Sequence, residues 1–256
     1  MLSSATHPLA AGAGQLLAAG NSSPSPLWYT TRATGVVALL LLTATVALGV
    51  AGTARFSAEM LPRVVRSGLH RNLSLLTVVF VAVHVVSTVL DPYAGIGIVS
   101  AVIPFSSAYR PLWLSLGTIA FDMLLALIVT SLLRTRVPYR IWRGVHWISY
   151  ACWPVALWHG LGTGTDSRLS WLLMLDGLCA LVVASAVLWR LQLTGSGALR
   201  SAGMLGTAAF MLATIAFVTS GPLRAGWAER AGTPTRDLHS ASKATAQSAS
   251  RPGSRP

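Results

Sequence analysis

Charged residues are scarce in this chain. Only 10% of its 256 residues are Asp, Glu, Lys or Arg, whereas 53% are hydrophobic. An average soluble domain has about 25% charged residues. So little charge indicates a protein that lies mainly in lipid rather than in water.

Cysteine motifs and nucleotide-binding motifs are lacking as well. The two cysteines, Cys152 and Cys179, both fall in apolar stretches, so the sequence supports neither a disulfide framework nor a CxxC metal site. We expect both to pack as apolar residues. No Gly-rich nucleotide fingerprint occurs in the polar segments. Flavin or nicotinamide chemistry must therefore come from a partner.

Basic residues outnumber acidic residues by 19 to 7, which gives a net charge of +12. In a soluble protein this excess would suggest nucleic-acid binding. Here all but one of the cations are Arg, and they are scattered over loops and the C-terminal tail. This distribution is typical of charge that flanks membrane helices, so we predict contact with a lipid bilayer and no nucleic-acid partner.

Six stretches are long and apolar enough to cross a membrane, which takes about 20 residues in a helix. Four of them contain no charged residue, and two contain one carboxylate each, Asp122 and Asp176. The stretches are 33–54, 72–90, 111–133, 144–165, 169–189 and 201–223. We therefore predict an all-α integral membrane protein that forms a bundle of six transmembrane helices.

The two ends of the chain differ from this apolar region. Residues 1–26 are rich in Ala, Gly, Ser and Pro, and they lack the basic segment that opens a cleavable signal peptide. Residues 222–256 are polar and show no hydrophobic periodicity. We predict disordered tails over these two segments and a transmembrane domain over 27–221.

The arginines predict the orientation of the bundle. Ten of them lie in the loops after the first, third and fifth predicted helices, whereas the two opposite loops and the N-terminal flank have three. Positively charged loops tend to stay in the cytoplasm. We therefore predict a multi-pass protein of the cell membrane with both termini outside the cytoplasm, although the basic C-terminal tail runs against this bias.

Four of the six histidines lie in two of the predicted helices. His70 and His84, at the second helix, have the spacing i and i+14, and His146 and His159, in the fourth, have the spacing i and i+13. These spacings correspond to rises of about 21 Å and about 20 Å, so both pairs mark two similar depths. Because the second and fourth helices run parallel, we expect His70 to pair with His146 at the cytoplasmic depth and His84 with His159 at the outer depth.

The second spacing does not suit an ideal helix. At about 100° per residue, His70 and His84 return to nearly one face, whereas His146 and His159 differ by about 140°. Pro154 lies between the latter two, and a proline removes a backbone donor and crowds the preceding turn. We expect a kink or local bulge there to turn one histidine back toward the second helix.

Paired imidazoles at two depths favour haem ligation between the second and fourth helices. Neutral imidazole is a good axial ligand, and an iron with both axial positions filled suits electron transfer rather than oxygen binding. Hydrogen bonding between helices would explain a single intramembrane histidine, but four at matched depths favour ligands. Zinc is a weaker alternative, because no Cys or carboxylate lies near each pair to complete a tetrahedral site.

Histidine pairs with these two spacings on alternate helices resemble the ferric reductase-like transmembrane domain superfamily. This group includes the membrane part of NADPH oxidases and the haem-binding membrane subunit of the bacterial methionine sulfoxide reductase system. The resemblance covers about residues 27–221. It rests on His70, His84, His146 and His159, each of which matches a haem ligand of the family.

The resemblance implies the membrane subunit of an oxidoreductase with two b haems. Electrons would enter from a cytoplasmic flavin donor or from quinol. They would then reduce an acceptor outside the cytoplasm, such as ferric iron, oxygen or a partner enzyme. The sequence departs from the oxidases because it has no C-terminal FAD and NADPH domain. A separate reductase or the quinone pool would therefore supply the flavin or quinone.

Arginines near the histidines are further candidates for cofactor binding. Arg66 and Arg71 flank His70, and Arg143 precedes His146, so these three are candidate partners of haem propionates. The positive-inside rule accounts for the same arginines without any cofactor.

Four other charged residues have weaker support. Arg110 and Arg168 are candidate partners of an outer haem. Asp122 and Asp176 lie within predicted helices, where a carboxylate can belong to a proton path or a quinol site. Each can equally be protonated and hydrogen-bonded to a neighbouring helix.

Two other classes of function remain open. A small transporter or channel could use the histidines as a proton relay, although transporters more usually carry Gly or Pro breaks at matched positions in two halves, and only Pro154 interrupts a predicted helix. A structural anchor could dock another protein through its cytoplasmic arginines. Four aligned histidines argue against an anchor.

Overall fold

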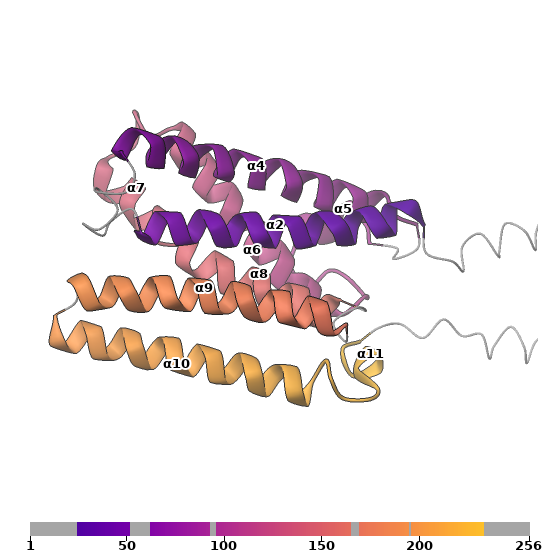
Figure 1. Cartoon of the computed structure of the whole chain (residues 1–256). Helices are drawn as coiled ribbons and strands as arrows, with labels where there is room; N and C mark the ends of the chain where they lie inside the picture. The colour runs from indigo at the N-terminus through magenta and orange to yellow at the C-terminus, as the bar shows by residue number, and fades with distance from the viewer. Residues whose placement is uncertain (1–24, 52–61, 93–95, 165–168, 195, 233–256) are drawn as a thin grey trace, which may run out of the picture.

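The computed structural model describes residues 25–51, 62–92, 96–164, 169–194 and 196–232. All regular elements in these ranges are helices (Figure 1). Five of them are long and apolar enough to cross a membrane: α2 (Pro26–Ala51), α4 (Arg63–Leu90), α6 (Pro111–Leu132), α9 (Ser170–Thr194) and α10 (Gly197–Ser220). The shorter helices are α5 (Ile98–Val102), α7 (Tyr139–His146), α8 (Ser149–Thr163) and α11 (Trp227–Arg230).

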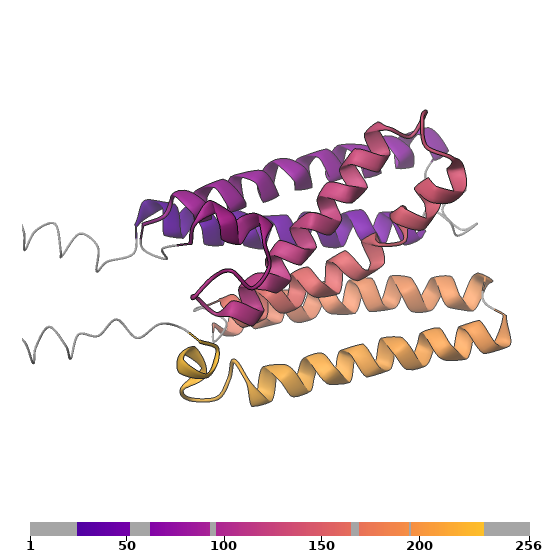
Figure 2. The ribbon, with the colours of Figure 1, turned by 180° about the vertical axis from the view of Figure 1, so that it is seen from behind.

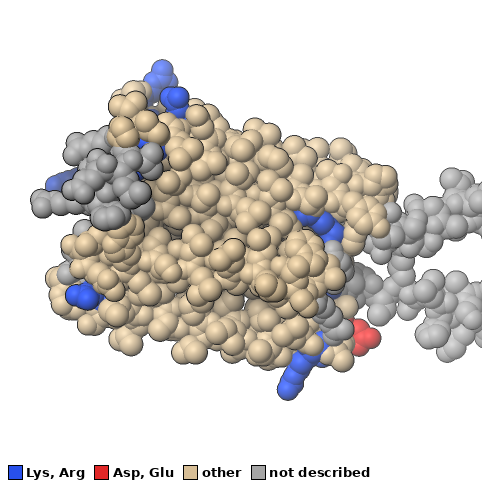
Figure 3. Space-filling view, in the orientation of Figure 1, with Lys and Arg blue, Asp and Glu red and all other residues tan. Residues whose placement is uncertain are grey.

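Large apolar side chains cover the outside of the bundle. Leu75 on α4 is 60% exposed, Met174 on α9 is 74% exposed and Leu212 on α10 is 67% exposed. Charged side chains gather toward the two ends of the face in Figure 3, and a band without charge lies between them. Because such a surface is unfavourable in water and favourable against lipid tails, the structure confirms the prediction of a helical, multi-pass membrane protein.

Two pairs of helices hold three of the four candidate histidines, and the fourth, His146, lies in α7. α2 packs along α4 in the antiparallel direction, and α6 packs against α8 (Figure 1). Seen from behind, α6 runs obliquely across the bundle (Figure 2). α9 contacts both α2 and α10. The histidine-bearing helices α4 and α8 therefore each lie against a partner helix, α2 or α6.

The two ends of the described chain lie at the same end of the bundle (Figure 1). The Ser25 hydroxyl, just before α2, donates a 2.7 Å hydrogen bond to the carboxylate of Asp91, just after α4. The backbone N–H of Arg110, just before α6, donates a 2.9 Å hydrogen bond to the carbonyl oxygen of Gly232. The start of α2, the end of α4, the start of α6 and the last described residue thus gather at one end, which we call the outer end; α7 lies at the opposite, inner end.

The predicted fourth span, 144–165, is divided into α7 and α8 rather than forming one kinked helix. The break lies at Trp147 and Ile148, several residues before Pro154. There the N–H of Ile148 donates to a carbonyl only three residues earlier, as in a 3₁₀ turn. Each residue of such a turn advances the chain by about 120° instead of about 100°. The break therefore makes up part of the rotation that we expected at Pro154.

α8 lies in the centre of the core. Its Trp153 and Leu161 are each 2% exposed, and they belong to one buried cluster with Cys179 of α9. The indole N–H of Trp153 donates a 2.9 Å hydrogen bond to the hydroxyl of Thr43 on α2. Cys152 and Cys179 are both free and buried, as expected, and the Cys152 thiol donates a 3.4 Å hydrogen bond to the carbonyl oxygen of Ala120.

Residues 221–232 fold back against the start of α6. The Trp227 ring in α11 lies 5.4 Å from the Trp113 ring, measured between centroids. This segment belongs to the predicted tail, so the folded region continues further than the sequence suggested. A lone Trp in a polar segment carries no periodic pattern, which is why the sequence did not reveal the contact. The remainder of both predicted tails lies outside the described residues.

Candidate functional site

The structure brings His84 of α4 and His159 of α8 together at the outer end. Their ring centroids are 6.3 Å apart, and their planes are 83° apart. Two imidazoles that bind one metal ion from opposite sides, through bonds of about 2 Å, have ring centroids roughly 6 Å apart. Two perpendicular ring planes can share the axis that passes through such an ion. This pair therefore has the separation that two axial ligands need.

Three of the four histidines make the same kind of hydrogen bond. In each, Nδ1–H donates to a backbone carbonyl of the partner helix: His84 to Thr31 over 2.8 Å, His159 to Trp113 over 2.8 Å, and His70 to Thr45 over 3.1 Å. A carbonyl oxygen only accepts, so Nδ1 carries the proton and the lone pair lies on Nε2. Metal-binding histidines typically fix their second ring nitrogen in this way.

The same three imidazoles each lie against a glycine of the partner helix. Gly35 and Gly49 of α2 face His84 and His70, and Gly117 of α6 faces His159. Our sequence interpretation did not identify these glycines. The only signal in the sequence is that Gly35 and Gly49 have the spacing i and i+14, which is also the spacing of the two histidines opposite them.

His146 differs from the other three histidines. It is the last residue of α7, which lies at the inner end of the bundle, where α4 begins with the turns that carry His70 (Figure 1). Its ring stacks on Trp142, with the centroids 5.0 Å apart and the planes 17° apart. Its Nδ1 atom is buried and has no hydrogen-bond partner among the described residues. The structure therefore brings His146 and His70 to the same end of the bundle, but it fixes only one of the two rings through Nδ1.

Among the described residues, three of the four buried side-chain polar atoms without a hydrogen-bond partner lie near the inner pair, and the fourth, the Trp227 indole N–H, lies at the outer end. Besides His146, the Trp142 indole N–H and the Thr45 hydroxyl are buried without a hydrogen-bond partner in the described part of the chain. Buried polar atoms of this kind are rare in folded proteins. Thr45 also supplies the carbonyl that His70 contacts. This environment fits a bound group that carries polar substituents.

The predicted inner arginines lie at the same end of the bundle as His70 and His146. Arg66 and Arg71 are four residues before and one residue after His70 in α4, and Arg143 is three residues before His146 in α7. Arg66 is partly buried, whereas Arg71 and Arg143 are exposed. A separate cation, Arg134, lies 4.8 Å from the Trp142 ring centroid. The inner end therefore carries several arginines close in sequence to the two histidines.

Arg110 has a structural role at the outer end. Its guanidinium donates a 2.8 Å hydrogen bond to the carbonyl oxygen of Gly162, in the last turn of α8. Burial lowers the pKa of the Arg110 guanidinium, the nearby Tyr109 opposes this shift, and the positive charge of Arg32 adds to it. Arginine nevertheless stays protonated in proteins. Arg32 directly follows Thr31, the residue that His84 contacts, and its guanidinium lies 4.4 Å from the centroid of the Trp28 ring. Arg168 lies outside the described residues.

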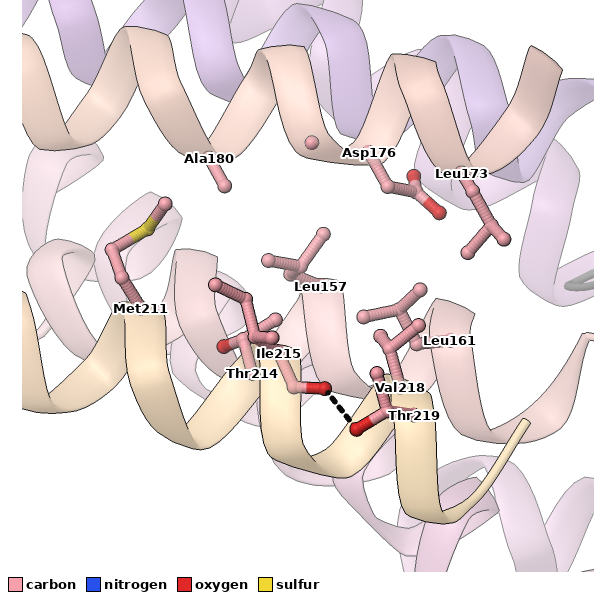
Figure 4. Close-up of a pocket in the computed structure, with 11 residues that line it drawn as sticks. Leu157, Leu161, Leu173, Asp176, Ala180, Met211, Thr214, Ile215, Val218 and Thr219 are labelled. Atoms are coloured by element: carbon pink, nitrogen blue, oxygen red, sulfur yellow. Dashed lines mark hydrogen bonds between the residues drawn. The ribbon is translucent and has the colours of Figure 1, made fainter. Parts of the chain in front are cut away.

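Asp176 lines a cavity between α8, α9 and α10 (Figure 4). The cavity has a volume of about 210 Å³ and an almost entirely apolar lining that includes Leu157, Leu161 and Thr214. Leu157 and Leu161 lie two residues before and two residues after His159, so they are on the other side of α8 from the histidine pair. Asp122 lies in α6 and is not part of this lining.

The described residues contain no group of three or more His, Cys, Asp or Glu side chains that could hold a metal ion. Each histidine pair therefore offers two imidazoles. A tetrahedral zinc site takes four ligands, whereas a haem takes two axial ligands in addition to its own macrocycle. The donor set on this structure fits the second type of group.

Comparison with known families matches residues 34–157 to the family described as ferric reductase like transmembrane component. The matched segment begins inside α2 and ends inside α8, so it includes His70, His84 and His146, and His159 follows two residues beyond it. This match confirms the resemblance drawn from the histidine pattern. Comparisons with curated proteins and with solved structures found no match.

Proposed function

Because residues 34–157 form a ferric reductase-like transmembrane domain, we propose that this chain holds b-type haem between paired histidines and passes single electrons across the membrane. The family match supports a role in membrane electron transfer. The number of haems, their ligands and the direction of electron flow belong to the proposal.

One observation carries the haem assignment. Three imidazoles, those of His70, His84 and His159, donate Nδ1–H to a backbone carbonyl and so keep an Nε2 lone pair. These bonds also join neighbouring helices, but they occupy only one nitrogen of each ring. Fixed rings with a lone pair on Nε2 are what a metal ligand requires. The 6.3 Å separation of His84 and His159 supports the same assignment.

Each pair would hold one haem. His84 and His159 hold the haem at the outer end, and His70 and His146 hold the haem at the inner end. A haem iron with two imidazole ligands gains and loses one electron at a time. At the inner end, Arg66, Arg71 and Arg143 offset the negative charge of the propionates. The indole N–H of Trp142 is a further donor there.

The helix directions support six crossings rather than five. Both ends of the described chain lie at the outer end of the bundle, which requires an even number of crossings (Figure 1). α7 and α8 together run from the inner end to the outer end and supply the sixth crossing. α8 alone has 15 residues, whereas a crossing takes about 20. The arginine-rich inner end faces the cytoplasm, so both termini lie outside it.

The chain is then the membrane subunit of an oxidoreductase. Its electron donor is either a separate cytoplasmic flavin reductase or quinol from the bilayer, and its acceptor lies outside the cytoplasm. The donor, the flavin or quinone and the acceptor would all be supplied by partners. The apolar cavity beside Asp176 suits a quinol, an apolar molecule with hydroxyl groups that lose protons on oxidation. Because the cavity borders α8 next to His159, a quinol bound there would reduce the outer haem, whereas a cytoplasmic flavin reductase would reduce the inner haem.

Spectroscopy of the purified protein tests the proposal. The wild type and the variants His84→Ala and His146→Ala are expressed with haem supplied, purified in detergent, and compared by reduced-minus-oxidised spectra and haem-to-protein ratio. We expect a six-coordinate b-type spectrum with close to two haems for the wild type, and a loss of about one haem in each variant. His239→Ala, in the polar tail of the sequence, is the control and keeps both haems. A colourless wild type would refute haem binding and favour a histidine proton relay instead.

A further inference from the structure

We propose that Gly35, Gly49 and Gly117 are positioning residues that seat the haem-ligating imidazoles against the backbone of the partner helices. This inference rests on the proposed haem function. Each glycine leaves a notch in its helix, and the ring of one histidine occupies that notch. The notch fixes the depth and the rotation of the ring, and with them the direction of the Nε2 lone pair.

The space between each glycine and its imidazole is too small for a side chain at two of the three positions. A Cβ atom built on Gly117 would lie 2.5 Å from Nδ1 of His159, and one built on Gly35 would lie 3.0 Å from Nδ1 of His84. A Cβ atom on Gly49 would lie 3.4 Å from Cε1 of His70. The first distance is impossible without movement, the second is very tight, and the third is close to an ordinary contact.

The glycines and the accepting carbonyls have a constant relationship. Each histidine donates to the carbonyl oxygen of the residue four positions before the glycine that it contacts. The three sets are Thr31 with Gly35 for His84, Thr45 with Gly49 for His70, and Trp113 with Gly117 for His159. One local geometry is therefore used three times, on two different helices.

Helix geometry explains this spacing. In an α-helix the carbonyl oxygen of one residue accepts the N–H of the residue four positions later, and it keeps a second lone pair. The Cβ atom of that later residue points back toward the N-terminus and so lies beside the same carbonyl. A glycine at this position removes the Cβ atom. The imidazole can then reach the second lone pair of the carbonyl.

The pairing of α2 with α4 repeats the geometry in register. Gly35 and Gly49 have the spacing i and i+14, and so do His70 and His84. Because the helices are antiparallel, the earlier glycine faces the later histidine. A glycine inside a helix costs about 1 kcal/mol relative to alanine. Positioning of the two imidazoles would offset this loss of helix stability.

Other glycines of the bundle provide matched controls. A Cβ atom on Gly160 or on Gly206 would have no atom within 4 Å. Gly160 is next to His159 in α8. Gly160→Ala therefore changes the same helix, but its added methyl group contacts no imidazole. Both Gly160→Ala and Gly117→Ala gain helix propensity to the same degree. Any difference between them therefore reports the space around the imidazole.

The test compares four alanine variants, Gly117→Ala, Gly35→Ala, Gly49→Ala and Gly160→Ala, in the full chain. Haem-to-protein ratio, the low-spin b-type spectrum and the midpoint potential are measured. Size-exclusion profile and melting temperature without added haem show whether each variant folds. We expect Gly117→Ala and Gly35→Ala to bind the outer haem at least about tenfold more weakly, as loss of a ligand's supporting contact typically does, with the inner haem retained. Gly49→Ala and Gly160→Ala are expected to keep both haems.

A larger side chain completes the series at the inner site. Gly49→Leu is expected to lose the inner haem and to keep the outer haem. If Gly117→Ala does not fold, the milder contact in Gly35→Ala decides the outcome. A folded Gly35→Ala variant with two haems, an unchanged spectrum and an unchanged potential would overturn the inference. A wild type without haem would instead overturn the proposed function, so the two failures are distinguishable.

Discussion

The guanidinium of Arg110 donates a 2.8 Å hydrogen bond to the carbonyl oxygen of Gly162, although only 1% of Arg110 is exposed. Arg110 precedes α6 with a positive φ of 41°, a conformation that non-glycine residues rarely adopt. The bond joins the start of α6 to the last turn of α8, where unpaired carbonyl oxygens favour a cation. The same two helices are connected by the bond from His159 to Trp113.

We predict that Arg110→Met destabilises the bundle. The substitution removes a buried hydrogen bond to a charged donor and leaves the Gly162 carbonyl without it, which costs about 2–3 kcal/mol. The melting temperature in detergent measures the effect. Arg200→Met is the control, because Arg200 is exposed at the other end of the bundle. Equal melting temperatures for the two variants would mean that Arg110 does not hold α6 and α8 together.

The two histidine pairs are predicted to differ in affinity for haem. Three imidazoles are fixed through Nδ1, but Nδ1 of His146 has no partner among the described residues. A missing hydrogen bond to the second nitrogen of a ligand typically lowers metal affinity by about 10–100-fold. We therefore expect the inner site to bind haem at least about tenfold more weakly than the outer site.

Single-site variants separate the two affinities. His84→Ala leaves only the inner site, and His146→Ala leaves only the outer site. Haem titrated into each variant is followed by the growth of the b-type absorbance. Tighter binding by His84→Ala than by His146→Ala would contradict the prediction, and it would show that ring stacking on Trp142 positions His146 as firmly as a hydrogen bond does.

Composition predicted the long helices, and residue spacing predicted the depths of the histidines. Both depend only on the solvation of apolar residues and on the geometry of a single helix. Uncharged runs of about 20 residues are favourable only in lipid, so the long helices α2, α4, α6, α9 and α10 could be located from the sequence. The spacing within each histidine pair fixes depth through the constant rise of a helix. The encounter of His84 with His159 at 6.3 Å follows from that depth.

The remaining features depend on contacts between helices, which local patterns do not encode. Glycine is common in membrane helices, so Gly117 cannot be recognised as a notch until α6 is placed against α8. Pro154 drew attention to the centre of the fourth span, yet the chain breaks at Trp147, where 3₁₀-type bonds tighten the turn. Arg110 looked like a candidate propionate partner, but the direction of its guanidinium is decided by the end of α8.

The proposed sixth crossing predicts opposite accessibility for two loops. Single cysteines are introduced as Arg136→Cys, before α7, and Leu169→Cys, after α8, because both positions are exposed. The natural Cys152 and Cys179 are each only 2% exposed and should contribute little background. We expect a membrane-impermeant maleimide to label Leu169→Cys in intact cells and Arg136→Cys only after permeabilisation. Labelling of both from the same side would show that α7 and α8 do not cross.

The cavity beside Asp176 predicts how a quinol donor would be oxidised. Oxidation of a quinol releases two electrons and two protons, so its site needs a base beside an apolar surface. The Asp176 carboxylate borders the cavity (Figure 4). Leu157 and Leu161 line the cavity from α8, and His159 lies on the opposite side of the same helix. An Asn side chain has similar size but cannot accept the proton. We therefore predict that Asp176→Asn slows reduction by a short-chain quinol at least about tenfold.

Haem content and complete reduction by dithionite should stay at the wild-type level in Asp176→Asn, because this residue contacts neither histidine pair in the structure described above. Asp122→Asn is the matched control, since Asp122 lies in α6 outside the cavity. The rate is followed in proteoliposomes by the rise of the reduced b-type band. An unchanged rate in Asp176→Asn would exclude the cavity as the site of quinol oxidation. Electrons would then have to enter through the inner pair, from a flavin reductase at the arginine-rich end.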